Sequence, residues 1–150
     1  MRLAIAAAKR GVRAGQTPFG SVIVKNGRVV CAEHNRVWLT TDSTAHAEVT
    51  AIRVACRKLK TIDLSGCTLY STCEPCPMCF SAIHWAKIDA IYFGTTIADA
   101  KSLGFSELTV SDRTLKRIGK SPVRITSGLL RRDNLALFKY FASRPGRRFY

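Results

Sequence analysis

The fold is decided by residues 67–93, CTLYSTCEPCPMCFSAIHWAKIDAIYF, which read as a strand, a helix and a second strand. The apolar run at 67–72 and the similar run at 88–93 have the length and composition of buried strands. Pro77 lies between them and suits the first turn of a helix. Apolar side chains then recur at helical spacing and form one buried face: Cys79, Ala82, Ile83 and Ala86. This order predicts two parallel strands joined by a crossover helix.

The flanking sequence extends this unit in both directions. Asn26-Gly27 is typical of a tight hairpin turn and predicts an antiparallel strand pair ahead of the parallel unit. Apolar periodicity predicts the remaining elements: a helix over 2–14, strands over 20–25 and 28–34, a polar loop over 35–45, a helix over 46–60, a short helix over 96–102, a short strand over 122–126 and a final helix over 129–142. We therefore expect a layered α/β domain with a mixed sheet.

Length and composition indicate a single domain. The chain has 150 residues, of which 47% are hydrophobic, which is enough for one core and too apolar for a disordered chain. No apolar run approaches the roughly 20 residues of a membrane-spanning helix. We interpret residues 1–13 as an amphipathic helix rather than a targeting segment, because Lys9 and Arg10 interrupt its short apolar stretch. The sequence therefore predicts one cytoplasmic domain over 1–150, without a membrane partner.

Basic residues are concentrated near the C-terminus. The chain has a net charge of +14, and residues 108–150 contain 11 basic and 2 acidic side chains, against 13 and 8 in residues 1–107. Such a segment can contact nucleic acid or an anionic substrate. It can equally be a solvated surface, and the sequence leaves both interpretations open.

Two short segments carry residues with catalytic chemistry. His46-Ala47-Glu48 opens one predicted helix, and Cys76-Pro77-Met78-Cys79 opens another. Because each helix follows or precedes a parallel strand, both helix starts should lie at the same edge of the sheet. One imidazole and two thiolates, from His46, Cys76 and Cys79, balance the charge of Zn²⁺ and leave its fourth position open, as in catalytic sites. Glu48 can then act as the general base of a hydrolytic reaction.

A structural zinc site is the alternative to this interpretation. Cys73 lies three residues before Cys76 and could close the coordination shell as a fourth ligand. Together with the basic segment, a closed site would suit a non-enzymatic zinc protein that binds nucleic acid. The remaining cysteines are scattered in apolar surroundings and are expected to be buried thiols: Cys31, Cys56 and Cys67.

At these motifs the chain resembles the cytidine deaminase superfamily, in which H-x-E is followed by P-C-x-x-C. Within it the chain is most similar to the guanine deaminase type. The matching stretches are residues 18–20, 21–26, 44–53, 66–70, 73–79, 82–86 and Gly104-Phe105. The likeness covers residues 3–107 well. It implies a three-layer α/β fold with a mixed central sheet of about five strands and helices on both faces.

The resemblance also implies residue roles. Substrate-binding positions are matched by five residues: Phe19, Asn35, Ala47, Trp85 and Tyr150. Glu107 matches an acidic residue that acts as a second proton carrier, although several relatives have Asp there. Tyr150 matches a C-terminal tyrosine that reaches the base from a segment exchanged between two chains. A homodimer in which residues 108–150 are exchanged follows from this likeness.

The sequence is compatible with two substrates known in this superfamily, guanine and a tRNA adenosine. The guanine deaminase type converts guanine to xanthine and ammonia. The sibling type deaminates a tRNA adenosine to inosine, and the net charge of +14 favours it because tRNA is a polyanion. We expect guanine or a related base, with tRNA as the alternative.

Overall fold

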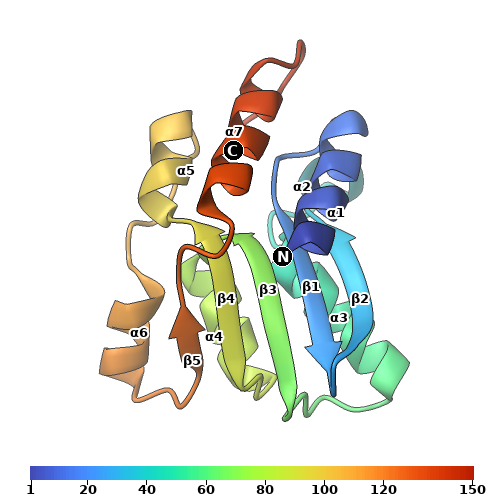
Figure 1. Cartoon of the computed structure of the whole chain (residues 1–150), viewed down its shortest axis with the longest axis vertical. Coiled ribbons are helices and arrows are strands. Elements are labelled where there is room, and N and C mark those ends of the chain that lie inside the picture. Colours follow the sequence, from blue (N-terminus) through green and yellow to red (C-terminus); the bar gives the residue numbers. More distant parts are fainter.

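The computed structural model describes residues 1–150 and contains one five-stranded sheet (Figure 1). The elements follow in this order: α1 (Arg2–Arg13), β1 (Gly20–Lys25), β2 (Arg28–His34), α2 (Val37–Thr40), α3 (Ala47–Leu59), β3 (Cys67–Cys73), α4 (Pro77–Trp85), β4 (Ala90–Thr95), α5 (Ile97–Leu103), α6 (Asp112–Gly119), β5 (Arg124–Thr126) and α7 (Arg131–Ala142). The structure has no helix that is both long and apolar enough to cross a membrane.

The sheet is mixed, as the sequence predicts. Its strand order is β2-β1-β3-β4-β5. The hairpin strands β1 and β2 pair antiparallel, and β1 also pairs antiparallel with β3. The pairs β3–β4 and β4–β5 are parallel. Because β3 and β4 run the same way, the chain enters α4 and α5 at one edge of the sheet.

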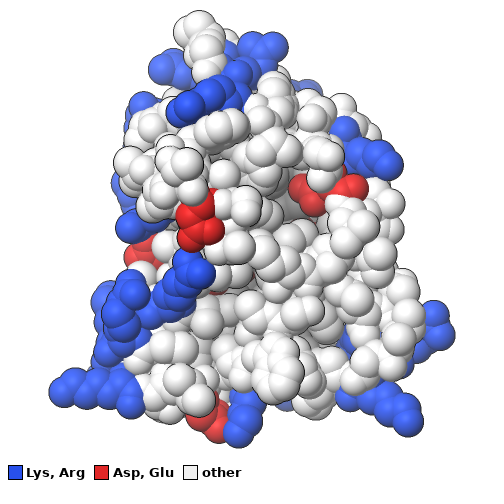
Figure 2. All heavy atoms as spheres, turned by 180° about the vertical axis from the view of Figure 1, so that it is seen from behind, with Lys and Arg blue, Asp and Glu red and all other residues white.

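Helices cover both faces of the sheet, which confirms the predicted three-layer fold. α3 and α4 pack side by side on one face, and α1 and α7 pack together on the other (Figure 1). The main core lies between the sheet and the α3–α4 layer and includes Ile23, Leu69 and Ile83. Viewed from the α3–α4 side, Lys and Arg side chains gather along the rim, and the centre of this face has few charged residues (Figure 2).

Two helices, α2 and α6, were not predicted from the sequence. α2 interrupts the predicted polar loop with a single turn. α6 was not expected because its eight residues include only two large apolar side chains, Leu115 and Ile118. Capping and packing form this helix instead: the Ser111 hydroxyl accepts a hydrogen bond from the N–H of Thr114 (3.2 Å), and Leu115 packs against the main core.

Candidate metal centre and active site

The starts of α3 and α4 bring three potential metal ligands together. His46 is the N-cap of α3, Cys76 is the N-cap of α4, and Cys79 lies in the first turn of α4. Because α3 leads into β3 and α4 leaves it, both helix starts lie at the edge of the sheet where β3 ends, as predicted. Helix N-termini carry partial positive charge, which favours thiolates and other anions at this edge.

The distances between these side chains fit a zinc ion. His46 Nδ1 lies 3.6 Å from Cys76 Sγ and 3.6 Å from Cys79 Sγ. For a tetrahedral ion with usual zinc–nitrogen and zinc–sulfur bond lengths, this separation is expected to be about 3.6 Å. The three ligand atoms all lie within 4.8 Å of one another. The donor set and its spacing therefore fit Zn²⁺ with three protein ligands.

The thiols at this edge differ in their surroundings. A hydrogen bond from Cys79, together with His46, lowers the pKa of Cys76 to about 4, so Cys76 is a thiolate at neutral pH. Burial holds the pKa of Cys73 well above its usual value, and its Sγ–H donates to the carbonyl of Thr96 (3.4 Å). Cys73 is not part of the three-ligand cluster. This arrangement argues against the closed four-ligand alternative.

Glu48 lies beside the ligands in a buried position. Its Oε1 accepts a hydrogen bond from the Ser71 hydroxyl (2.6 Å), and its Oε2 lies 3.5 Å from Cys79 Sγ. Burial raises the pKa of Glu48, and the Ser71 hydrogen bond opposes this effect. A carboxyl group that is held in place, with a raised pKa, is suited to accept a proton and return it.

Glu107 faces the same centre from another segment. An inner cavity of about 20 Å³, enough for one water molecule, is lined by His46, Glu48, Cys76 and Glu107 among others. An outer hollow of about 220 Å³ is also lined by Glu107. Burial, followed by the negative charge of Cys76, raises the pKa of Glu107 to about 7. Glu107 can therefore exchange a proton near neutral pH.

The C-terminal residue, Tyr150, lines the outer hollow. The hydroxyl of Tyr150 accepts a hydrogen bond from Asn35 Nδ2 (2.6 Å), and its ring centroid lies 5.5 Å from that of His46. Tyr150 also packs edge-on against Trp38, and the guanidinium of Arg148 lies 4.5 Å from the centre of the Trp38 ring. The last residues of the chain are thus held over the predicted metal centre.

Comparison with known proteins agrees with this geometry. Residues 1–95 match the model of the cytidine and deoxycytidylate deaminase zinc-binding region. The chain belongs to this deaminase family. It is therefore a zinc hydrolase of the cytidine deaminase type, with His46, Cys76 and Cys79 as its possible metal site.

The proteins similar to this deaminase include guanine deaminases and tRNA adenosine deaminases. A guanine deaminase of Bacillus subtilis (strain 168) is 46% identical over 108 residues, which span 71% of this chain and 69% of that protein. A tRNA-specific adenosine deaminase of Aquifex aeolicus (strain VF5) is 44% identical over 93 residues, but the match covers only 62% of either protein. A solved guanine deaminase from Nitrosomonas europaea is 28% identical with a TM-score of 0.86, covering 94% of this chain and 81% of that chain.

The structure of this deaminase places most of the predicted site residues together. Phe19 borders the inner cavity and packs on Phe105 at a ring distance of 4.9 Å, so it belongs to both the core and the pocket. Ala47 is fully buried in the same apolar cluster. Asn35, Glu107 and Tyr150 lie around the outer hollow or its cover.

Trp85 does not lie in the zinc pocket of its own chain. It is the last residue of α4, whereas Cys76 and Cys79 are at the start, so the length of the helix separates them. Its side chain is 81% exposed and borders a separate hollow of about 550 Å³. Within one chain Trp85 therefore does not line the pocket, and its role in substrate binding stays a prediction. The motif identifies the helix but does not show which end of it faces the substrate.

Sequence reasoning did not identify three contributors to the site. Ser71 holds Glu48, Trp38 supports the C-terminal residues, and Glu74 contacts the starts of α5 and α6. Ser71 and Glu74 lie in or next to the motif strand, where alternation along a strand could have pointed to Ser71. No local pattern indicates the contact between Trp38 and residues more than a hundred positions away.

Proposed function

We propose that this deaminase acts on a free purine base and converts guanine to xanthine and ammonia. The observation that carries the proposal is the position of Tyr150, which lines the outer hollow beside His46 and is held there by a hydrogen bond from Asn35. A planar base fits under an aromatic cover, whereas a nucleotide within tRNA requires an open approach. The identity to the Bacillus guanine deaminase, 46%, is slightly higher than the 44% identity to the Aquifex adenosine deaminase.

The roles of the residues follow from their positions. When bound at an open three-ligand site, zinc supplies a nucleophile at neutral pH by lowering the pKa of a coordinated water to about 7. As the water oxygen bonds to C2 of guanine, Glu48 would accept the proton of that water and deliver it to the adjacent ring nitrogen. Glu107 would give a proton to the amino group, and the C2–N bond would break to release ammonia, while the proton of the new hydroxyl returns to a carboxylate. Asn35 and Tyr150 hold the base, and Phe19 and Ala47 form the apolar floor.

Deamination of tRNA adenosine is the second candidate. The basic residues near the mouth favour it, since Arg144, Arg147 and Arg148 all lie within seven residues of Tyr150. A solved tRNA:A34 deaminase is also similar, at 32% identity and a TM-score of 0.77. In this case the C-terminal residues would have to leave the pocket before RNA enters.

The proposal includes a homodimer in a reducing compartment. Trp85 and Ile118 are exposed apolar side chains that border one hollow of about 280 Å³, and a second copy would cover them. In the single chain Tyr150 contacts Asn35 of the same chain, so exchange of residues 108–150 remains a prediction. The thiolates of Cys76 and Cys79 must stay reduced to bind metal, which is consistent with the cytoplasm.

A substrate panel tests the proposal. The zinc-loaded protein is incubated separately with guanine, guanosine, adenine, cytosine, cytidine and an unmodified tRNA, and ammonia release is measured. We expect turnover of guanine above all others. Inosine formed in the tRNA, with guanine untouched, would establish the second candidate instead. Analytical ultracentrifugation of the same sample tests the dimer.

A further inference from the structure

The side chain of Glu74 contacts two helices at once. Its Oε2 accepts a hydrogen bond from the backbone N–H of Ile97 (3.2 Å), and its Oε1 accepts one from the N–H of Asp112 (3.1 Å). Ile97 is the first residue of α5, and Asp112 is the first residue of α6. Amides at a helix start lack partners within the helix, and the helix dipole favours a carboxylate there. A single carboxylate therefore caps both helices.

The backbone around Glu74 is fixed to the metal-binding edge of the sheet. The N–H of Glu74 donates to the carbonyl of Thr95 (2.8 Å), the last residue of β4. Cys76, one of the three metal ligands, follows two residues later. Glu74 therefore joins the loop that carries a metal ligand to the segment that runs from α5 to α6.

That segment carries Glu107. Residues 105–111 form neither helix nor strand, so their position depends on how the flanking helices are held. The helix starts on either side, at Ile97 and Asp112, both bind Glu74. The only other backbone bond from this loop to a distant element runs from the Ser106 N–H to the carbonyl of Tyr150 (3.1 Å). At its start the loop is held by the buried ring of Phe105, which packs on Phe19 and Phe141. At its end the loop is held by the bond from Asp112 to Glu74, so the location of Glu107 relative to Cys76 depends in part on the Glu74 carboxylate.

We propose that Glu74 is a positioning residue for Glu107. Its carboxylate sets the distance between the metal-ligand loop and segment 97–112, so that Glu107 faces the inner cavity. Glu74 also lines the inner cavity, but both of its carboxylate oxygens are bound to helix amides, so it acts there through Glu107. The inference rests on the proton-carrier role that the proposed function gives to Glu107.

The substitution Glu74→Gln tests the two hydrogen bonds from the helix starts to Glu74 with little change in the shape of the side chain. One acceptor oxygen becomes an NH₂ group, which cannot accept a hydrogen bond from a backbone amide. We expect unchanged zinc content, faster amide hydrogen exchange over residues 105–111, and a kcat for guanine lower by on the order of 10-fold to 100-fold, because small misplacements of a catalytic group have effects of this size. The KM should change little.

A double-mutant cycle separates positioning from a structural role. With Glu107→Gln already present, Glu74→Gln should change kcat by less than about twofold, because the positioned group is gone. A merely structural residue would lower kcat by the same factor in both backgrounds. If Glu74→Gln lowers kcat equally in both backgrounds, and Glu107→Gln alone also lowers kcat, the inference is overturned and the proposed function stands. Wild-type turnover by Glu107→Gln would overturn the role of Glu107 and the inference together.

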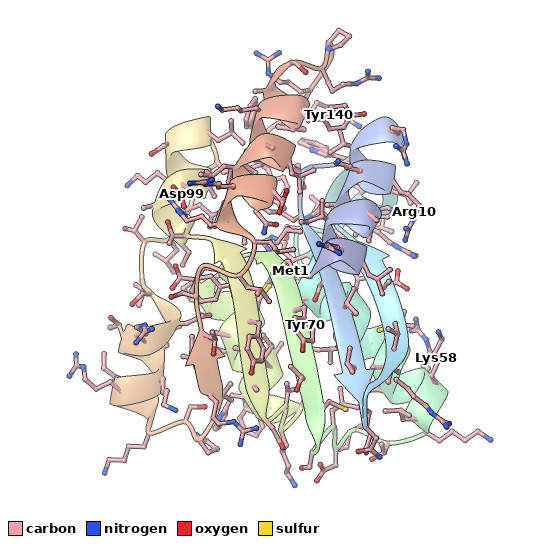
Figure 3. All side chains as sticks on the ribbon, in the orientation of Figure 1. Met1, Arg10, Lys58, Tyr70, Asp99 and Tyr140 are labelled. Carbon is pink, nitrogen blue, oxygen red and sulfur yellow. The ribbon has the colours of Figure 1, made fainter.

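Asp99→Asn is the matched control. Asp99 also caps α5, accepting from the Thr96 N–H (2.8 Å), and it lies between α5 and α7, where it pairs with Arg131 (Figure 3). Its hydrogen bonds reach neither α6 nor the metal-ligand loop. We expect this variant to be less stable, with kcat within about twofold of wild type. A kcat loss equal to that of Glu74→Gln would overturn the inference.

Glu74→Asp provides a second variant if Glu74→Gln does not fold. Aspartate keeps the charge but is one methylene shorter, so it can bind only one of the two amides well. We expect an intermediate increase in hydrogen exchange over residues 105–111 and an intermediate loss of kcat. If amide hydrogen exchange over residues 105–111 is the same in the Glu74 variants as in the wild type, the inference is overturned, whichever base is the substrate.

Discussion

The carboxyl group of Asp112 is buried at the start of α6 without a hydrogen-bond partner for either oxygen. Burial raises its pKa from the usual 3.8 to about 9, and the negative charges of Glu74 and Glu48 add to the effect. The folded protein therefore holds Asp112 protonated at neutral pH, whereas the unfolded chain ionises it. We predict that Asp112→Asn, which keeps the shape of the neutral side chain, stabilises the protein at neutral and alkaline pH.

The magnitude follows from the difference in proton binding. Above pH 4 the native state binds one proton more than the unfolded state, so the free energy of unfolding falls by up to about 1.4 kcal/mol per pH unit. At pH 7 the accumulated loss has an upper bound of about 4 kcal/mol. Because the first turn of α6 partly stabilises a negative charge, we expect Asp112→Asn to gain about 2 kcal/mol at pH 7 and more at pH 8.

Urea unfolding of both proteins at pH 5, 6, 7 and 8, at one fixed zinc concentration, measures this difference. Asp133→Asn is the control, since Asp133 lies in the first turn of α7 but is exposed. The control should change stability by less than about 1 kcal/mol, with no trend over this pH range. A gain from Asp112→Asn that is equal at pH 5 and pH 8, or a loss at both, would refute the reasoning.

Three further predictions concern the site. Glu48→Gln should retain zinc and lower kcat by about 10³-fold, because general base catalysis contributes roughly 10²-fold to 10⁴-fold; metal analysis and ammonia release measure both, and near-normal turnover would contradict the assigned base. Burial and the charge of Cys76 raise the pKa of Glu107 to about 7, so its proton-donating form is lost as pH rises. We expect kcat to fall above about pH 7, and the pH profile of Glu107→Gln to lack this decrease. Trp38→Ala removes the ring under Arg148 and should raise KM about threefold with little change in kcat, since such a contact contributes about 0.5–1 kcal/mol; steady-state kinetics that show only a kcat loss would argue against a cover held by Trp38.

Local patterns predicted the metal centre because its geometry is mostly local. Cys76 and Cys79 are three residues apart at a helix start, and this spacing alone puts both thiols on one side. His46 and Glu48 share the start of α3 in the same way. The strand, helix and strand of residues 67–93 then required parallel strands, which bring both helix starts to one edge.

Contacts between distant residues could not be predicted in this way. Asn35 and Tyr150 are 115 positions apart, and only the packing of α7 and the chain after it brings them together. α6 was not predicted because a cap and one partly buried leucine, Leu115, stabilise it, without a longer apolar stripe. The motif could not show which end of α4 faces the pocket, and within one chain Trp85 lies at the end far from the metal ligands.

The sequence by itself predicted the fold class, the candidate metal ligands and the proposed general base, because helix periodicity and strand alternation act over a few residues. Only the tertiary structure decided how the site is closed and how its second carboxylate is held. The cover of Tyr150 and the double cap of Glu74 join segments whose separation along the chain leaves no local trace. Their formation depends on the packing of whole elements, which fixes distances that no short pattern encodes.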